Sequence, residues 1–213
     1  MYRINEIFYS LQGEGYHTGT PAVFVRFSGC NLHCPFCDTE FADYKAMSAE
    51  EIVAKINALK SQPSTLNSQP STLSRPGAQA SSPAISNTNH SPLIVLTGGE
   101  PALQVDDHLL TALHTTGMPI CIETNGTLAL PDGIDWITCS PKQGTQIALT
   151  RAHELKIVLT DDSNPEQWLQ YVRADHLFLQ PCSCQNTEQV IQYILRHPHW
   201  RLSLQTHKYL HIR

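Results

Sequence analysis

The chain has 213 residues, of which 41% are hydrophobic, so it is long enough to form one domain with a substantial core. Its 14 lysine and arginine residues against 19 acidic residues give a formal net charge of −5, and no run of basic residues indicates nucleic acid or a membrane surface as a partner. Its apolar stretches are too short for a membrane-spanning helix and the N-terminus lacks the pattern of a secretory signal, so we expect a cytoplasmic protein.

Two strands are predicted ahead of a cluster of cysteines. Residues 3–9 alternate apolar and polar side chains, which is typical of an edge strand or of one arm of a hairpin. Residues 22–27 form a more continuous apolar run that leads directly into the loop carrying Cys30, Cys34 and Cys37. In a reducing compartment, closely spaced cysteines indicate metal or redox chemistry more often than disulfides.

A helix is predicted after this loop. Residues 48–51, Ser-Ala-Glu-Glu, form a capping box that opens it. One face of the helix is apolar, because hydrophobic residues recur at helical spacing at Ile52, Val53, Ile56 and Leu59.

The composition changes between about residues 60 and 92. Serine, proline, asparagine and glutamine dominate, and Ser-Gln-Pro-Ser-Thr-Leu occurs at both 61–66 and 68–73. The seven-residue period also fits a heptad coiled coil, but the prolines argue against one. Because this segment is too polar to bury a core, we predict a disordered surface insertion within a single domain that spans residues 1–213.

The remainder of the chain alternates between predicted strands and helices. Strands are predicted at residues 93–96, 119–123, 136–140, 155–159, 176–180 and 201–205, and helices at 105–116, 165–172 and 187–197. Such alternation implies an α/β fold with a parallel sheet and right-handed crossovers. Six or seven strands of this kind fit either an open, partial barrel or a doubly wound sheet, and the pattern alone does not distinguish the two.

Polar or glycine-rich motifs stand where the predicted strands end. Because parallel sheets bind ligands at the carboxyl ends of their strands, we expect these motifs to open onto one face and form a single site. The five motifs are Gly29-Cys30, Thr97-Gly98-Gly99-Glu100, Glu123-Thr124-Asn125-Gly126, Ser140-Pro141-Lys142 and Gln180-Pro181.

The spacing Cys30-x3-Cys34-x2-Cys37 supplies three thiolates from one short loop. Three cysteines on a four-iron cluster leave one iron without a protein ligand, which is the open position an enzyme needs. A zinc site is an alternative, but it would require a fourth ligand, and His33 is crowded by its neighbours in the loop. Three inert buried thiols are a further alternative, but a turn-forming loop is a poor place to bury them. We therefore predict an iron–sulfur cluster.

This cysteine motif, with Phe36 before its last cysteine, resembles the signature of the radical S-adenosylmethionine superfamily. The resemblance implies a partial (open) parallel β/α barrel whose catalytic cysteines bind a [4Fe-4S] cluster. It also implies that S-adenosylmethionine chelates the free iron and is cleaved reductively to a 5′-deoxyadenosyl radical. Residues 97–101, Thr-Gly-Gly-Glu-Pro, look like the superfamily's second-strand motif, in which Gly99 permits close backbone approach and Glu100 adds negative charge near a cationic ligand.

The motifs around this centre resemble the 7-carboxy-7-deazaguanine synthase family over nearly the whole chain outside residues 60–92. The resemblance implies conversion of 6-carboxy-5,6,7,8-tetrahydropterin to 7-carboxy-7-deazaguanine with loss of ammonia, on the route to queuosine. It implies magnesium, an electron donor such as flavodoxin or ferredoxin, and a homodimer. The matching motifs are residues 7–15, Arg26, Cys37-Asp38-Thr39, Glu123-Thr124-Asn125-Gly126, Ser140-Pro141-Lys142 and Gln205-Thr206-His207-Lys208.

The resemblance also implies roles for individual residues. Arg26 is expected to pair with the pterin carboxylate, although a surface ion pair is an alternative. Thr39 is expected to bind magnesium, with a helix N-cap as the alternative. Glu123 and Asn125 fit either a pterin contact or a structural turn. The remaining substrate contacts are expected at Leu11, Gln12, Gly13 and Thr97, and the S-adenosylmethionine contacts at Phe36, Gly99, Glu100, Ser140, Pro141, Lys142, Gln180, Pro181, Cys182 and Ser183.

Some features fall outside this pattern. Cys121 and Cys139 are expected in the core, and the pair Cys182 and Cys184 is thin support for a second cluster. The chain ends at Arg213, whereas some family members end on a residue that helps to close the substrate pocket. Two other functions share the cysteine motif: an activase that makes a glycyl radical on a partner protein, and a zinc-binding adaptor without activity.

Overall fold

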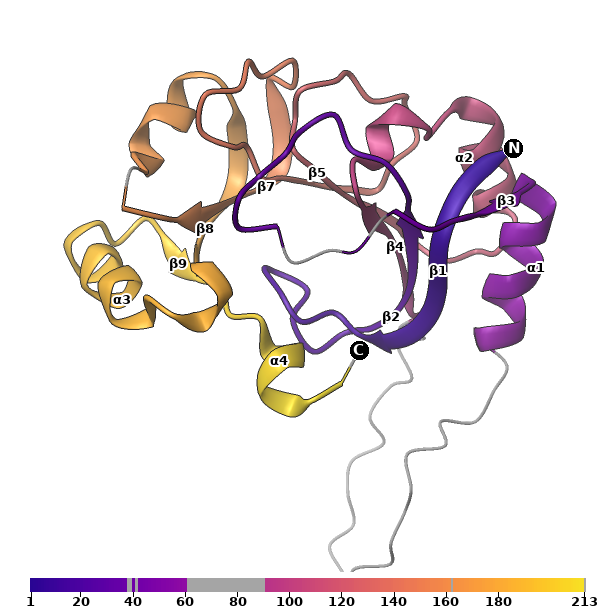
Figure 1. Cartoon of the computed structure of the whole chain (residues 1–213), viewed down its shortest axis with the longest axis horizontal. Coiled ribbons are helices and arrows are strands. Elements are labelled where there is room, and N and C mark those ends of the chain that lie inside the picture. The colour runs from indigo at the N-terminus through magenta and orange to yellow at the C-terminus, as the bar shows by residue number, and fades with distance from the viewer. Residues whose placement is uncertain (38–39, 41, 61–90, 162, 213) are drawn as a thin grey trace, which may run out of the picture.

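The computed structural model describes residues 1–37, 40, 42–60, 91–161 and 163–212 (Figure 1). The insertion predicted at about residues 60–92 falls almost entirely outside the described residues. Thr39 and Arg213 lie outside them as well.

One sheet of nine strands forms the body of the described chain, in the order β3-β1-β2-β4-β5-β6-β7-β8-β9. From β2 to β9 the strands are parallel and follow chain order without reversing direction. A doubly wound sheet requires such a reversal, so the fold is the open, partial barrel, and Figure 1 shows the strands curving around a central space. The strands are β1 (Tyr2–Leu11), β2 (Pro21–Phe27), β3 (Lys45–Met47), β4 (Leu93–Gly98), β5 (Ile120–Thr124), β6 (Trp136–Cys139), β7 (Arg151–Leu159), β8 (Arg173–Pro181) and β9 (Arg201–Leu202).

The first strand is an arm of a hairpin, as one of the two predicted alternatives stated. It pairs antiparallel with β2 along most of its length, and β3 pairs only with its first residues, Tyr2 to Ile4. β1 and β3 are thus two antiparallel strands beside the parallel part of the sheet, and β3 was not predicted. The pairing of β1 with β2 carries the β1–β2 loop to the end of the barrel opposite the cysteine loop.

Several strand predictions differ from the structure at their ends, as β7 and β9 show. β7 begins at Arg151 instead of residue 155, because Glu154 and Lys156 interrupt the apolar run although both are buried on the inner face. β9 ends at Leu202 instead of residue 205, and beyond it the side chains of Ser203 and Gln205 form hydrogen bonds with Gln180 and Glu14.

The helices confirm the predicted capping signals. Ser48 Oγ accepts a hydrogen bond from the Glu51 backbone N at 3.2 Å, and Glu51 Oε2 accepts one from the Ser48 N at 2.8 Å. Residues 165–172 were predicted to be helical and form a short 3-10 helix instead of an α-helix. The α-helices are α1 (Ala49–Lys60), α2 (Asp107–His114), α3 (Thr187–Arg196) and α4 (Thr206–Leu210), and the 3-10 helices are η1 (Pro101–Leu103), η2 (Pro165–Gln170) and η3 (Cys182–Cys184).

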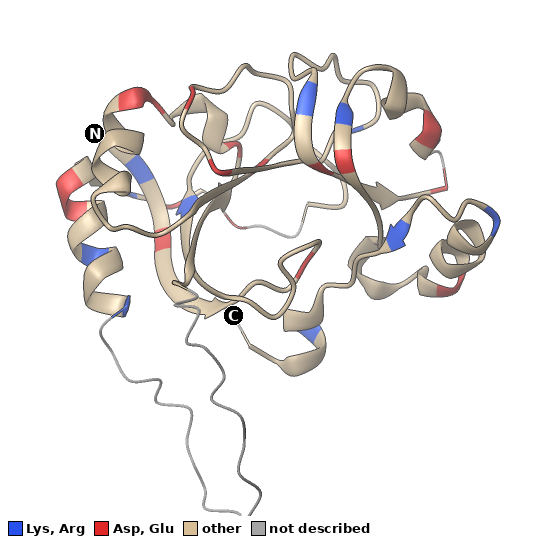
Figure 2. Cartoon of the chain, turned by 180° about the vertical axis from the view of Figure 1, so that it is seen from behind, with Lys and Arg blue, Asp and Glu red and all other residues tan. Residues whose placement is uncertain are grey.

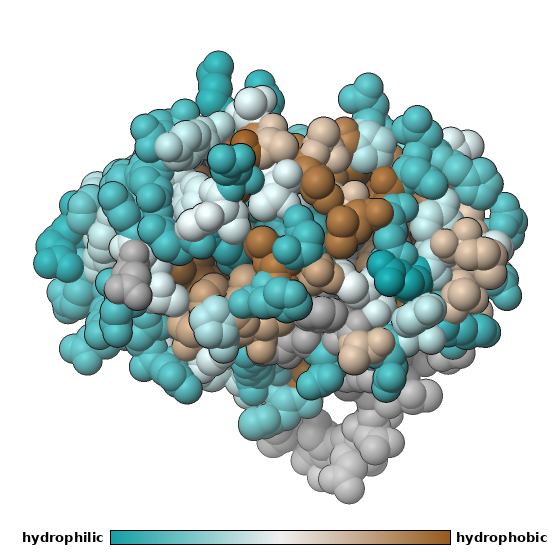
Figure 3. All heavy atoms as spheres, turned by 45° about the horizontal axis from the view of Figure 1, so that its top comes forward, coloured by the Kyte–Doolittle hydropathy of each residue, from teal (hydrophilic) through white to brown (hydrophobic). Residues whose placement is uncertain are grey.

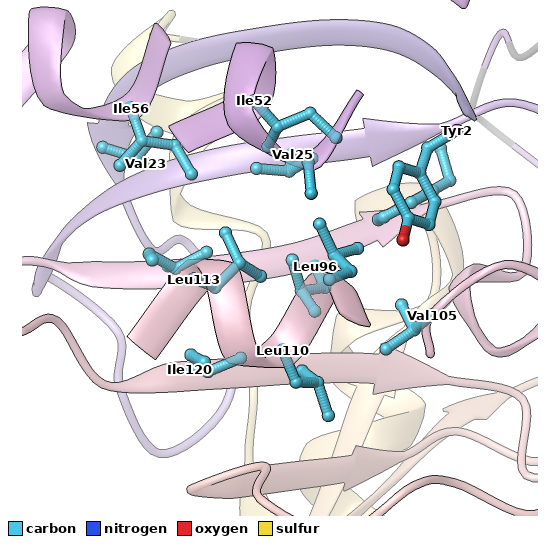
Figure 4. Close-up of a cluster of buried hydrophobic side chains, with 14 of the residues drawn as sticks. Tyr2, Val23, Val25, Ile52, Ile56, Leu96, Val105, Leu110, Leu113 and Ile120 are labelled. Atoms are coloured by element: carbon cyan, nitrogen blue, oxygen red, sulfur yellow. The ribbon is translucent and has the colours of Figure 1, made fainter. Parts of the chain in front are cut away.

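Apolar side chains cover the sheet on both faces. Outside the barrel, Ile52 and Ile56 of α1 and Leu113 of α2 pack on β2, β4 and β5 (Figure 4). A second outer cluster under α3 contains Cys139, and an inner cluster contains Cys121, so both cysteines are core residues as predicted. These layers fix the positions of the strand ends that carry the polar motifs.

The surface agrees with the composition. Figure 2 shows basic and acidic residues interspersed over the outer elements, and Figure 3 shows a group of apolar residues bordered by hydrophilic ones. Among the described helices, none has both the length and the apolarity that a membrane span requires.

Candidate functional site

The carboxyl ends of the parallel strands surround one cavity of about 310 Å³. Each of the five strand-end motifs contributes at least one residue to its wall, so the structure brings them together as expected. The predicted site residues that line it are Leu11, Gln12, Gly13, Arg26, Cys30, Cys34, Phe36, Cys37, Thr97, Gly99, Glu100, Ser140, Lys142, Gln180, Pro181, Cys182 and Ser183. Pro141 is not part of this wall, because its side chain is buried behind the turn between Ser140 and Lys142.

The cysteine loop packs directly against the end of β4. Glu100 N donates a hydrogen bond to the Gly29 carbonyl at 2.9 Å, and Gly99 N donates one to the Phe27 carbonyl at the same distance. A Cβ atom on Gly99 would lie 2.0 Å from that Gly29 oxygen. The double glycine is therefore required for contact between two protein loops, in addition to the close ligand approach that the sequence suggested.

The three cysteines of the loop all face the cavity. The Leu32 backbone N donates a hydrogen bond to Cys30 Sγ at 3.4 Å, and Cys37 N donates one to the Cys34 carbonyl at 3.1 Å. Burial raises the pKa of the Cys30 and Cys34 thiols. In the part of the chain that the structure describes, no three His, Cys, Asp or Glu side chains converge on a position for one metal ion. In a cubane cluster each thiolate binds a different iron, so three separated sulfurs are compatible with it.

Glu100 links the ends of two neighbouring strands. The side chain is 1% exposed, and its Oε1 accepts hydrogen bonds from Ala102 N at 2.9 Å and Thr124 Oγ1 at 2.7 Å. Its Oε2 accepts one from Asn125 N at 2.7 Å. Burial raises the pKa of this carboxyl even though the three hydrogen bonds lower it. Glu100 thus links the ends of β4 and β5, and a carboxylate can accept more hydrogen bonds than these three, so it can also accept one from a ligand in the cavity.

Asn125 also has structural partners. Its Nδ2 donates a hydrogen bond to Asn31 Oδ1 at 2.9 Å, and its Oδ1 accepts one from Thr127 N at 2.9 Å. These bonds join the turn after β5 to the cysteine loop. They favour the structural turn over the pterin contact for this residue.

Lys142 and Arg26 are the predicted cations of the site. Lys142 Nζ donates hydrogen bonds to the carbonyl and hydroxyl of Ser140 at 2.8 and 2.7 Å, and burial lowers its pKa. The Arg26 guanidinium lies 3.1 Å from Glu6 Oε1 and 5.3 Å from the centre of the Phe8 ring. Arg26 therefore forms the ion pair considered as its alternative and lines the cavity as well.

An ion cluster on the inner face of β7 was not predicted from the sequence. Lys156 is 4% exposed, forms an ion pair with Glu14, and lies 3.6 Å from Glu123 Oε1. Gln205 Nε2 donates to Glu14 at 3.0 Å, and Gln12 Nε2 donates to Glu123 at 2.9 Å. The available signal was the period-two spacing of Glu154, Lys156 and Val158, which places the three side chains on the same face of one strand.

The charges in this cluster shift one another. Burial raises the pKa of Glu14, but the charge and hydrogen bond of Lys156 and the bond from Gln205 outweigh it and lower that pKa to about 2. Burial lowers the pKa of Lys156, but the charges of Glu123, Glu14 and Glu154 raise it further. The ion pair between Glu14 and Lys156 is therefore charged at neutral pH.

The β1–β2 loop and the segment after β9 meet across the open side of the barrel. Thr206 N and Oγ1 donate hydrogen bonds to the Gly13 carbonyl at 2.9 and 3.0 Å. Gly15 N donates one to Ser203 Oγ at 2.9 Å. The β1–β2 loop is in this way tied to the segment after β9, and both contribute residues to the cavity.

Two of three comparisons with known proteins found similar proteins, and both point to the same family. No family model matches the chain. Proteins described as 7-carboxy-7-deazaguanine synthase are similar over its full length: one from Bacteroides thetaiotaomicron is 48% identical and covers 100% of both chains. One from Bradyrhizobium diazoefficiens is 42% identical over 100% of this chain and 99% of its own. The crystal structure of QueE from Escherichia coli superimposes with a TM-score of 0.64 at 26% identity and covers 95% of this chain and 93% of that chain.

Proposed function

The chain belongs to the 7-carboxy-7-deazaguanine synthase family, and on this premise we propose that it is a radical S-adenosylmethionine lyase. It converts 6-carboxy-5,6,7,8-tetrahydropterin to 7-carboxy-7-deazaguanine with release of ammonia, in queuosine biosynthesis. The observation that carries the proposal is the cavity at the strand ends, in which the three loop cysteines lie beside all the other strand-end motifs.

The residues present fit the two cofactors that this reaction needs. Cys30, Cys34 and Cys37 would hold a [4Fe-4S] cluster, and the Leu32 N–H bond to Cys30 supports a thiolate there. Bound together, the cluster and S-adenosylmethionine supply the radical that removes a hydrogen atom from the substrate. The remaining acceptor capacity of Glu100 suits the amino group of S-adenosylmethionine, and Ser140 and Lys142 suit its polar groups.

The cavity walls around Phe36 and at the end of β8 suit the rest of S-adenosylmethionine. Phe36 and Gly99 lie next to the cysteines, and Gln180, Pro181, Cys182 and Ser183 offer an edge for the adenine. Pro141 does not line the cavity, so we propose that it acts only by shaping the turn between Ser140 and Lys142.

The opposite wall suits a carboxylated pterin. Gln12 and Gly13 are held by hydrogen bonds to Glu123 and Thr206, so they form a fixed edge of the cavity against which a planar ring can lie. Thr97 faces the same space from β4, and the Leu11 backbone from the end of β1. The Arg26 guanidinium has five N–H donors and shares them with Glu6, so it can also bind the substrate carboxylate.

Further parts of the proposal follow from the family. Thr39, outside the described residues, is proposed to bind magnesium through its hydroxyl. We also propose a single radical domain that includes residues 60–92, a homodimer, reduction by flavodoxin or ferredoxin, and a cytoplasmic location.

Anaerobic turnover tests the proposal. Protein reconstituted with iron and sulfide is incubated with the carboxypterin, S-adenosylmethionine, magnesium and a reductant, and the deazaguanine and ammonia are measured. Cys34→Ala is expected to lose both iron and activity, whereas Cys121→Ala, in the inner core, is expected to keep its iron. A fully loaded cluster that gives no deazaguanine would favour the glycyl-radical activase, and a colourless protein that carries zinc would favour the adaptor.

A further inference from the structure

The loop between β1 and β2 has two halves with different surroundings. Residues 12–14 form part of the wall of the substrate cavity, whereas Tyr16 contacts residues near the amino ends of β6, β7 and β8. Two hydrogen bonds close the loop: Gln12 N donates to the Thr20 carbonyl at 2.8 Å, and Gly19 N donates to the Gln12 carbonyl at 2.7 Å. The position of the cavity wall therefore depends on what holds the second half of the loop.

A turn at Gly15 brings this second half against β7. Gly15 has a φ of +65°, and a Cβ atom on it would lie 2.0 Å from Oε1 of the buried Glu154, so a larger residue would displace that carboxyl. Oε1 has no hydrogen-bond partner among the described residues, while Oε2 accepts a hydrogen bond from Tyr16 N at 3.0 Å. Burial raises the pKa of Glu154, which favours the neutral acid in this place.

The side chains that follow the turn pack on a group of rings from the sheet. The Tyr16 ring stacks on Trp136 of β6 with centres 4.9 Å apart, and on His176 of β8 with centres 4.4 Å apart. The edge of His17 meets Trp136 at 4.5 Å, and His153 of β7 stacks on Trp136 at 5.1 Å. Aromatic pairs at these distances stabilise a contact beyond the area that they bury. These five rings, the ring stack, thus join the loop to three neighbouring strands.

Little space separates the ring stack from the substrate wall. The void between them has a volume of about 10 Å³, which is no more than one water molecule needs. Its lining includes His17 and Trp136 of the ring stack, and also Gln12 and Glu14, which line the substrate cavity as well. Because protein interiors are close-packed, these two residues have little room to shift while the rings are in place.

The exposure of Tyr16 separates its role from that of a core residue. Its side chain is 47% exposed, and its hydroxyl forms no hydrogen bond with another residue that the structure describes, so the ring contacts are what its side chain contributes. Replacement of such a residue has little effect on global stability. The motif at residues 7–15 that resembles the family ends directly before Tyr16, so the resemblance gives this residue no role.

We propose that Tyr16 is a positioning residue for carboxypterin binding. Its ring, stacked on Trp136 and His176, holds the β1–β2 loop so that residues 12–14 are already ordered in the cavity wall before the substrate arrives. A wall that is ordered in advance spares the substrate the cost of ordering it. This inference rests on the proposed function, because the carboxypterin is the substrate of that reaction. S-adenosylmethionine is bound by other strand ends in that proposal, so its affinity does not depend on Tyr16.

Hydrogen exchange in the cluster-loaded enzyme without pterin tests the first step. Tyr16→Ala is expected to speed backbone exchange within residues 12–20 by about threefold to tenfold, because the ring contacts no longer oppose opening of the loop. Tyr16→Phe keeps the ring and should exchange like the wild type. Tyr171→Ala is the matched control, since it removes a 56% exposed tyrosine ring that packs on Trp168, and it should leave residues 12–20 unchanged.

Calorimetric titration of carboxypterin tests the second step, on enzyme that holds S-adenosylmethionine and an oxidised cluster. Tyr16→Ala should raise the Kd of carboxypterin by about threefold to tenfold, with unchanged iron content and an unchanged Kd of S-adenosylmethionine. Tyr16→Phe should restore the wild-type Kd. His176→Ala removes a partner ring and should also raise it, and the double variant should bind no more weakly than the weaker single variant, because both changes break one contact.

Unchanged exchange or unchanged carboxypterin affinity in Tyr16→Ala would overturn the proposal, as would a Tyr16→Phe protein as impaired as Tyr16→Ala. Equal losses of carboxypterin and S-adenosylmethionine affinity would also overturn it, since they would indicate a general structural defect. A wild type that binds no carboxypterin would overturn the proposed function and with it the role in substrate binding. The exchange experiment contains no pterin, so it still decides whether the ring holds the loop.

Discussion

Replacement of Lys156 by methionine removes the positive charge from the ion cluster while keeping most of the side-chain volume. Lys156 is 4% exposed, and the change leaves the partly buried Glu14 and Glu123 without their cation. Breaking a buried ion pair in this way costs about 3–5 kcal/mol. For a domain of this size that corresponds to a fall in Tm of about 6–20 °C.

The same change predicts an altered pH dependence of stability. In the wild type the pKa of Glu14 is lowered from 4.5 to about 2, so Glu14 stabilises the fold above pH 4.5 and this contribution is lost as the pH falls towards 2. The difference of 2.5 pKa units corresponds to roughly 3 kcal/mol. In Lys156→Met burial is no longer opposed by the lysine, so the pKa of Glu14 rises and acid no longer destabilises the protein through this group.

Anaerobic urea unfolding between pH 3 and 8 measures both effects. Lys55→Met, an exposed change on α1, is the matched control and should follow the wild type at every pH. If Lys156→Met lost stability with falling pH as steeply as the wild type does, the assignment of the low pKa of Glu14 to Lys156 would be wrong.

Three further predictions concern the proposed site. Arg26→Ala should weaken carboxypterin binding by about 1–3 kcal/mol, because Arg26 is 33% exposed and shares its donors with Glu6. Isothermal titration calorimetry measures this change, and an unchanged affinity would contradict the role of Arg26. Gly99→Ala should displace the cysteine loop, since the new Cβ lies 2.0 Å from the Gly29 oxygen; iron content should fall well below that of Gly117→Ala, where a Cβ meets no atom within 4 Å. Thr39→Ala should reduce the stimulation of turnover by magnesium without loss of iron, and an unchanged magnesium response would remove Thr39 as a ligand.

Much of the site could be predicted from local sequence. The strand ends are set by short apolar runs followed by glycine or polar residues, and the carboxyl ends of parallel strands must meet at one edge of a sheet. That Cys30, the Thr97–Glu100 motif and the Ser140–Lys142 turn line one cavity follows from that geometry. Pro141 was predicted to contact S-adenosylmethionine together with Ser140 and Lys142, because a sequence motif does not show which of its side chains point into the cavity.

The ion cluster escaped prediction for a different reason. Glu14, Glu123 and Lys156 lie on three separate elements, and each alone reads as an exposed charge. They meet because the β1–β2 loop folds back against the inner face of β7, and nothing local in the sequence specifies that contact. The same contact hides the free oxygen of Glu154.

The sequence by itself determined most of the elements, the three-thiolate loop and the resemblance to a family, since these depend on local periodicity and on spacing along the chain. The resemblance also implied an open barrel, which the sheet confirms, and only the tertiary structure decided which residues close it and how its buried charges pair. Those outcomes depend on contacts between residues as far apart as 193 positions, such as Thr206 with Gly13, and their free energy comes from burial that exists only once the chain has folded.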